Sequence, residues 1–360
     1  MSTSVSGAIE ARHAFGRLLG ELRPKLHRYC ARMTGSVIDG EDVVQEALVK
    51  AIEAFPQVES IVHLEGWLFR IAHNAALDFL RRRARQEAAR SDEDPDMIVD
   101  PAAAADHRQI ATASLRTFMR LPVAQRSSVI LMDVLGYSLE EIGGVIDGSI
   151  PAVKAALHRG RARLRELLQE PEDFPVPVLA EPERLLLATY IDRFNARDFD
   201  AIRNMLAHEV RLDLVARKQM NGRREVGGYF HNYSSVRDWH LVPGLVDRHP
   251  AALVRDPGDP SGTPAYFVLL EWVGDRVGSI RDFRHARYAT VHRVARKRQA
   301  DGNSRGVKPI CRVAYLLRTT DAEQTESTHR RHQGIEPGQY VHRGEERRHQ
   351  VHALLQTLVS

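Results

Sequence analysis

Residues 138–168 read SLEEIGGVIDGSIPAVKAALHRGRARLRELL, and this stretch decides the fold of the middle of the chain. Ser138 and Glu141 form a capping box, which predicts a helix over residues 139–146. Gly148 can take a left-handed backbone and predicts a break before a second helix. A short capped helix, a tight turn and a longer basic helix are typical of a helix-turn-helix, whose second helix can enter a major groove.

The second helix has one apolar and one basic side. Its apolar residues recur every three or four positions and should be buried: Val153, Leu157, Leu164 and Leu168. The other side is small or basic, and its candidates for DNA contact are Ala152, Lys154, Ala155, His158, Arg159 and Arg161. A basic helix is as often a solvated surface, so this segment alone leaves both interpretations open.

The composition suits a globular protein of two or three domains, since the 360 residues are 43% hydrophobic and 27% charged. The formal net charge is only +4. From Val291 onward, 13 Lys and Arg stand against 7 Asp and Glu, so the basic excess lies in the tail. Global charge therefore does not argue for nucleic acid, and local clusters must carry that argument.

The two cysteines, Cys30 and Cys311, lie far apart and have no metal-ligand neighbours at useful spacing. This predicts a reducing compartment, with no disulfide framework, zinc site or cofactor. The N-terminal residues lack the apolar core of a signal peptide, and no run reaches the length of a membrane span. We therefore expect a soluble, cytoplasmic protein.

Helical periodicity marks three segments in the first 85 residues: 8–32, 41–55 and 66–85. The second and third read DGEDVVQEALVKAIEAF (39–55) and GWLFRIAHNAALDFLRRRAR (66–85). These motifs, in this order, resemble region two of extracytoplasmic-function sigma factors of the sigma-70 family. The matching residues are Asp42, Gln45, Glu46, Trp67, Leu68, Ile71, Ala72, Asn74, Asp78 and Arg81.

Residues 121–168 resemble region four of the same family, including the LHRGR run at 157–161. One departure concerns Ala155 and Ala156, where the family usually has a Ser-Arg type pair. An arginine that could contact a base is therefore missing, which leaves open how this helix reads sequence.

The resemblance implies a role for each motif. Asp42, Gln45 and Glu46 would contact core RNA polymerase, whose largest-subunit clamp and flap regions are the expected partners. The following helix would hold promoter DNA through Arg70, Asn74, Arg81 and Arg82, since Asn74 offers a donor and an acceptor to a base and arginines neutralise phosphates.

The last third has a different pattern. Residues 184–206 predict one amphipathic helix and 225–233 a short one. Strands are expected at 210–215, 239–246, 251–255, 265–272 and 276–283. This order of elements resembles the cone-shaped SnoaL-like, nuclear-transport-factor-like fold. Such cones hold a pocket, whose candidate lining here is Asp213, Tyr229, Trp239, His240, Trp272 and Asp282.

The resulting layout is two all-α domains followed by an α+β domain. Its parts are region two (8–85), an acidic linker (86–108), region four (109–169), a proline-rich linker (170–183), the SnoaL-like domain (184–290) and a basic, disordered tail (291–360). The tail could attract phosphates or be unrelated to the fold, and its His329 and His332 are too few for a metal site.

The favoured interpretation is an alternative sigma factor that catalyses nothing itself, directs polymerase to promoters and helps to melt them. Its fused domain is expected to touch region two or region four, or a small molecule, and to tune access to polymerase. Two rivals remain. One is a helix-turn-helix regulator that works without polymerase, from which the Asp42, Gln45 and Glu46 surface and Asn74 distinguish it. The other is a SnoaL-type enzyme with a DNA-binding appendage.

Overall fold

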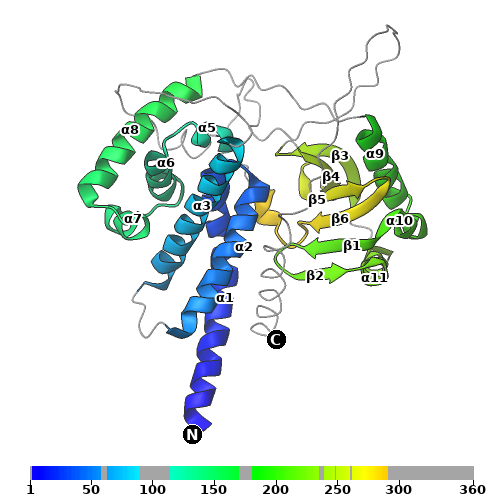
Figure 1. Cartoon of the computed structure of the whole chain (residues 1–360), viewed down its shortest axis with the longest axis horizontal. Helices are drawn as coiled ribbons and strands as arrows, with labels where there is room; N and C mark the ends of the chain where they lie inside the picture. The colour runs from blue at the N-terminus through cyan, green and yellow to red at the C-terminus, as the bar shows by residue number, and fades with distance from the viewer. Residues whose placement is uncertain are drawn as a thin grey trace.

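The structure is a computed structural model that describes residues 2–57, 63–88, 114–169, 181–234, 239–247, 249–259 and 262–290. A helical body and an α+β body lie side by side (Figure 1). The expected linkers and the tail from residue 291 lie mostly or wholly outside the described residues, as does Cys311.

Three helices form the first part of the helical body: α1 (Ser2–Thr34), α2 (Val37–Ala54) and α3 (Leu64–Ala88), with a 3-10 turn η1 (Phe55–Gln57) after α2. Ser36 begins α2, because its hydroxyl accepts a hydrogen bond from the Asp39 amide at 2.9 Å. The three helices expected from periodicity are therefore present. Helices α1 and α3 extend beyond both predicted ends, whereas α2 begins four residues earlier and ends one residue sooner than predicted.

The second part contains α5 (Leu115–Met119), α6 (Val123–Val129), the π-helical turn η2 (Ile130–Val134), α7 (Leu139–Ile146) and α8 (Ile150–Gln169). The capping box of Ser138 and Glu141 is present at the start of α7. The left-handed residue that ends α7 is Asp147, at φ 54°, and not Gly148 as predicted. An aspartate tolerates this conformation better than most residues with a side chain.

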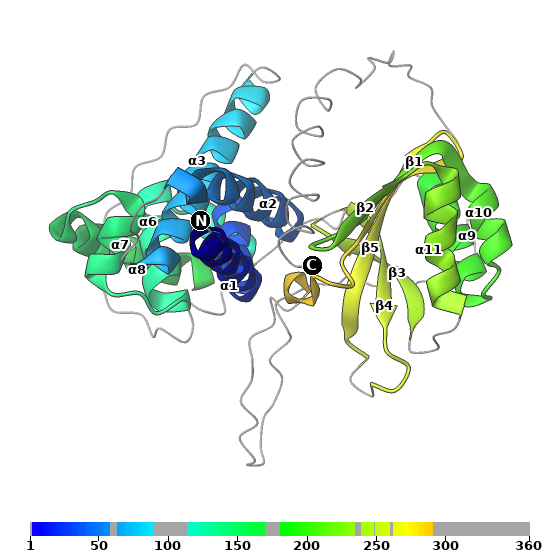
Figure 2. The same ribbon diagram turned by 90° about the horizontal axis from the view of Figure 1, so that it is seen from below.

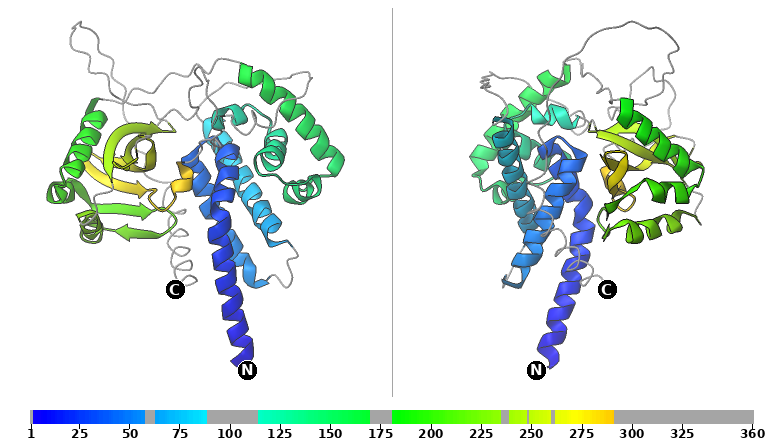
Figure 3. Two further views of the ribbon diagram at one scale, coloured as in Figure 1. Left: turned by 180° about the vertical axis from the view of Figure 1, so that it is seen from behind. Right: turned by 45° about the vertical axis from the view of Figure 1, so that its right-hand side comes forward.

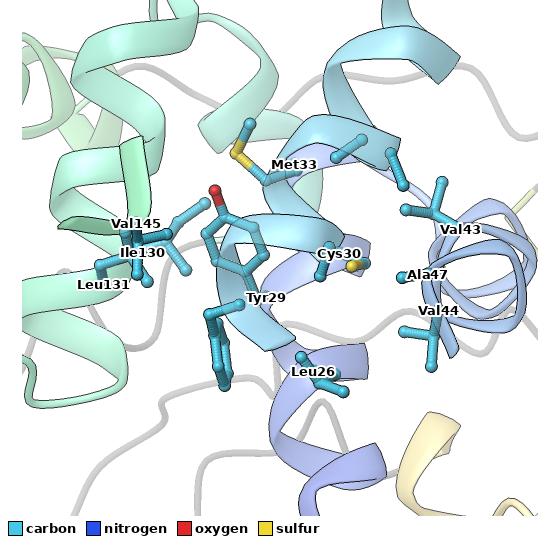
Figure 4. Close-up of a cluster of buried hydrophobic side chains, with 14 of the residues drawn as sticks. Leu26, Tyr29, Cys30, Met33, Val43, Val44, Ala47, Ile130, Leu131 and Val145 are labelled. Atoms are coloured by element: carbon cyan, nitrogen blue, oxygen red, sulfur yellow. The ribbon is translucent and has the colours of Figure 1, made fainter. Parts of the chain in front are cut away.

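Both helical parts share one apolar core. Side chains of α1 lie between Val43, Val44 and Ala47 of α2 and a second group from the later helices, Ile130, Leu131 and Val145 (Figure 4). Arg126 of α6 adds polar links, donating to the carbonyl oxygens of Met33 (2.7 Å), Met119 (3.0 Å) and Leu121 (2.9 Å). The two helical parts therefore pack against each other.

The α+β body is a six-stranded sheet in the order β2-β1-β6-β5-β4-β3. Its strands are β1 (Leu206–Leu214), β2 (Lys218–Asn221), β3 (His240–Val246), β4 (His249–Arg255), β5 (Pro264–Val273) and β6 (Arg276–Asp282). All neighbours pair antiparallel except β1 and β6, which are parallel. Helices α9 (Glu181–Asn195), α10 (Phe199–Met205) and α11 (Arg223–Ser234) cover one face, confirming the α+β class (Figure 2).

One prediction for this body was wrong, and one strand was missed. The single helix expected over 184–206 is broken between α9 and α10, where Arg197 takes a left-handed φ of 61° and the Asp198 carboxylate caps the Ala201 amide at 3.0 Å. The strand β2 was not predicted, because its four residues give too short an alternation to detect.

The other face of the sheet lies against α1 and α2 (Figure 3). Apolar side chains from both bodies form one buried cluster there: Ala31, Val37, Ile38, Val215, Ala251, Leu253, Phe267, Leu269, Phe283, Ala286 and Ala289. A short 3-10 turn, η3 (Arg287–Ala289), also contacts α1 and α2. The sheet is therefore sandwiched between its own helices and the helical body.

Candidate functional site

The polar side of α2 carries the three residues expected to contact polymerase. Asp42, Gln45 and Glu46 are spaced by three and four residues, so they lie on neighbouring turns of one face. The Gln45 side-chain oxygen accepts from Arg23 of α1 at 2.9 Å. The Asp42 carboxylate accepts from Arg281 of β6 at 2.7 Å. The first two positions of this face are therefore already engaged within the chain.

Glu46 lies one turn further along this face of α2, beside α3. Its carboxylate pairs with Lys50 at 2.9 Å and with Arg82 at 2.8 Å. Burial alone would raise the pKa of Glu46, but hydrogen bonds from Arg82 and Lys50 outweigh it and lower the pKa. Glu46 is consequently ionised at neutral pH, and Arg82, expected on DNA, is paired with it.

Beneath this surface lies a buried ion pair that the sequence did not reveal. Glu41 is 1% exposed and pairs with Arg23, which also donates to the Tyr288 hydroxyl at 2.8 Å. Tyr288 in turn donates to Glu41 at 3.0 Å. Because Tyr288 follows the last strand, this network joins the α+β body to the helical body.

The DNA candidates on α3 divide into free and paired side chains. Arg70 and Asn74 are exposed and one turn apart. Arg81 is exposed but contacts Asp78 at 3.3 Å, and Arg82 is engaged by Glu46. Arg70 and Asn74 are therefore the better-presented pair.

The candidates on α8 divide in the same way. Ala152, Lys154, His158 and Arg159 are exposed, and Ala155 is half-buried. Arg161 instead forms a two-pronged ion pair with the buried Asp133, with N–O distances of 2.9 and 2.5 Å. Arg161 thus joins α8 to η2, which leaves it less available to DNA than Lys154 or Arg159.

Comparison with known proteins identifies these helices. The family model for sigma-70 region 2 matches residues 18–86, and that for sigma-70 region 4 matches residues 115–164. The ECF RNA polymerase sigma factor SigM of Mycobacterium tuberculosis is 33% identical over 44% of this chain and 78% of its own length. This chain belongs to the ECF RNA polymerase sigma factors.

Other similar proteins cover more or different parts of this sigma factor. SigG of Mycobacterium tuberculosis is 28% identical over 77% of this chain and 82% of its own length. The sigma factor RpoE of Bartonella quintana, solved in complex with the anti-sigma factor NepR, is 26% identical, covers 43% of this chain and 97% of its own, and has a TM-score of 0.35. A SnoaL-like protein of unknown function from Burkholderia thailandensis is 20% identical, covers 29% of this chain and 96% of its own, and has a TM-score of 0.24.

The family establishes what the helical body does. An alternative sigma factor binds core RNA polymerase and promoter DNA and directs transcription initiation. Among the described residues, no helix is long and apolar enough to cross a membrane, and no group of three metal-ligating side chains comes together.

The pocket candidates of the sigma factor's α+β body do not all meet. Tyr229 and Asp282 are buried together on the helix-covered face, where both Tyr229 and Tyr233 donate to one Asp282 oxygen. Trp239 is buried beside Tyr233, with ring centroids 5.6 Å apart. Trp272 packs at the edge of the same cluster.

Two pocket candidates are corrected by their position on the strands. Asp213 lies on the opposite face of the sheet, beside Arg281, because side chains alternate along β1 and β6. His240 is exposed. Two tyrosines that were not predicted, Tyr233 and Tyr266, belong to the buried cluster, with their hydroxyl oxygens 3.4 Å apart.

The buried cluster is held by its own hydrogen bonds. Burial raises the pKa of Asp282, and it raises the pKa of Tyr266 to about 12 and that of Tyr233 far higher. The second oxygen of Asp282 accepts from the Arg284 amide at 2.8 Å. The tyrosines are therefore protonated donors at neutral pH, with Asp282 as their shared acceptor.

Proposed function

We propose that the acidic side of α2 is the polymerase contact of this sigma factor, and that its α+β domain restricts that contact. Asp42, Gln45 and Glu46 bind polymerase in this proposal, whereas the exposed residues of α3 and α8 hold promoter DNA. The observation that carries the proposal is the ion pair between Asp42 and Arg281. Arg281 engages both Asp42 oxygens, at 2.7 and 3.4 Å, so a polymerase cation would have to displace Arg281 and the two partners compete.

Arg281 is well placed to hold Asp42. It projects from the face of β6 that meets α2, with its side chain only 16% exposed, and its guanidinium also lies 3.8 Å from Asp213. Two carboxylates therefore share one largely desolvated cation, which strengthens the attraction relative to a surface pair. Nearby carboxylates accordingly offset the effect of burial and raise the pKa of Arg281 above its usual value.

A second contact fixes the beginning of α2. The Asp247 carboxylate, just after β3, accepts from the Ser36 hydroxyl at 2.8 Å and from the Ile38 amide at 3.0 Å. A carboxylate at a helix N-terminus satisfies free amides and interacts favourably with the helix dipole. The α+β domain thus grips both the start and the polar side of α2, and the apolar cluster between the bodies adds burial.

Replacing Arg281 tests the competition. In the full-length chain, Arg281→Ala should tighten binding to core polymerase by about five- to 150-fold, the usual range for coupled sites. Arg276→Ala is the matched control, because Arg276 lies on the same strand but contacts Asn204 instead of α2. Fluorescence anisotropy with labelled sigma factor gives both affinities, and equal affinities would refute the competition.

Charge reversal tests the polymerase contact separately. Glu46→Lys should weaken polymerase binding, because it places a cation where the proposal requires an anion. Glu53→Lys, a reversal elsewhere on α2, serves as its control. If Glu46→Lys leaves both polymerase binding and initiation unchanged, the assignment of this face is wrong, whatever the result at Arg281.

The α+β domain is regulatory rather than catalytic in this proposal. The support is that both oxygens of Asp282 are satisfied by Tyr229, Tyr233 and the Arg284 amide, so this carboxylate has no free role as a base. The rival, a SnoaL-type enzyme, predicts turnover of an added ketone or enol by the full-length protein that Asp282→Asn abolishes.

A further inference from the structure

The outward side of α8 begins with an apolar line made by Pro151 and Ala155, which is followed by the polar His158. At helical spacing, Pro151, Ala155 and His158 form the middle of the side opposite the buried stripe, and the first two of these residues carry no hydrogen-bonding side chain. Ile150, at the first position of the helix, is 37% exposed and is among the few large apolar side chains that the described part of the protein leaves open.

Two arginines of α8 are already paired within the chain. Arg161 is held by Asp133, and Arg163 by Glu166 at 2.9 Å. Ala156, the second residue of the pair that departs from the family pattern, is 5% exposed and faces the core. The exposed cations Lys154 and Arg159 flank the apolar line on its two sides rather than occupy it.

The chemistry of DNA limits what such a surface can read. In a helix-turn-helix, the N-terminal residues of the second helix contact base edges in the major groove. The apolar feature that a base edge presents there is the C5 methyl group of thymine, and alanine-type methyl groups contact it. Flanking lysine and arginine side chains contact phosphates, which fixes position without reading sequence.

We propose that the first turns of α8 read thymine methyl groups, with Ile150, Pro151 and Ala155 as the specificity-determining residues. The inference rests on the proposed function in one respect, namely that α8 enters the major groove of promoter DNA. The recognised upstream element carries thymines opposite these residues, and Lys154 and Arg159 add affinity that is independent of sequence.

Removing single methyl groups from DNA tests the inference without changing the protein. Holoenzyme assembled from the full chain and core polymerase first selects from promoters randomised in the upstream element. Each enriched thymine is then replaced by uracil, which differs only by the methyl group. Binding should weaken about threefold to fourfold for each contacted thymine, the effect of one buried methyl-sized group. Uracil elsewhere in the same duplex is the control.

A protein variant assigns the contact to its residue. Ala155→Arg supplies a guanine donor, so it should abolish the thymine–uracil difference at one position and favour a G·C pair there. If an element is enriched but binds equally well after its thymines are replaced by uracil, the inference is wrong and the sigma-factor function still stands. Failure to enrich any upstream element would refute DNA reading by α8 altogether.

Discussion

The two surfaces that this sigma factor needs differ in what covers them. The outward face of α8 carries exposed Lys154, His158 and Arg159. The α+β body instead meets α2 at three places, with Arg281 on the polar side, Asp247 at the start of the helix and Tyr288 on the buried Glu41. The face of α8 proposed to bind DNA is therefore exposed to solvent, whereas the side of α2 proposed to bind polymerase already has partners within the chain. This difference is what the proposed competition requires, since the α+β domain would then restrict polymerase binding and leave the DNA-facing side of α8 accessible.

The largest effect is expected from weakening the buried contact between the α+β body and the helical body. Phe283 is fully buried between the bodies and stacks on Phe267, with ring centroids 4.1 Å apart. Phe283→Ala should lower the free energy of unfolding by about 3–5 kcal/mol, because it leaves a cavity in the shared cluster. Urea denaturation followed by circular dichroism measures this change.

The control for that prediction is Val273→Ala, since Val273 is 67% exposed. It should change the stability by no more than about 0.5 kcal/mol. A loss at Phe283 no larger than the loss at Val273 would show that the cluster between the bodies does not hold them together.

The sequence predicted helix α8 better than it predicted the contacts on the polar side of α2. Ser138 and Glu141 lie three residues apart, so a local rule was enough to place α7 and hence α8. Asp42 and Arg281 are 239 residues apart, and no local pattern connects a carboxylate on a helix to a cation on a strand. The motif that suggested a role for Asp42 could not show that the chain itself occupies it.

The interior of the α+β body shows the same limit. Alternation along a strand fixes which residues share a face, but not which face meets the helices. Asp213 pairs in register with Arg281, and the next pair is Leu214 with Asp282, so the two acids necessarily face opposite sides. Without knowing that β1 and β6 are neighbours, both looked equally suited to a pocket.

Acidification should weaken the packing between the two helical parts. The expected loss in the free energy of unfolding is smaller than that for Phe283→Ala. His73 is buried on α3, bonds to the Tyr29 hydroxyl at 2.7 Å and lines a groove that also contains Val123 and Ile146. Burial lowers the pKa of His73 to about 4, from 6.5 in an open chain. Between about pH 6.5 and pH 4, the unfolded chain therefore binds a proton at His73 that the folded chain does not bind.

The stability that neutral His73 contributes is fully present above about pH 6.5 and is lost as the pH falls toward 4, by about 3 kcal/mol at most. NMR titration should find the His73 ring still neutral at pH 5.5, and His73→Gln should flatten this part of the stability profile. His158→Gln, at an exposed position, should leave the profile unchanged. A His73 pKa near 6.5 would contradict the prediction.

The smallest expected effect is on DNA binding by Lys154, on the exposed face of α8. Lys154→Ala should reduce the slope of log affinity against log salt by about one, because one phosphate contact is lost, and it should weaken every promoter alike. Lys218→Ala, on β2 of the other body, is the matched control and should leave the slope unchanged. Since Lys154 packs against nothing in the core, its removal should change the free energy of unfolding by no more than about 0.5 kcal/mol. If Lys154→Ala changed which promoter sequences are preferred, Lys154 would contact a base. Sequence reading on α8 could then not be assigned to the apolar residues alone.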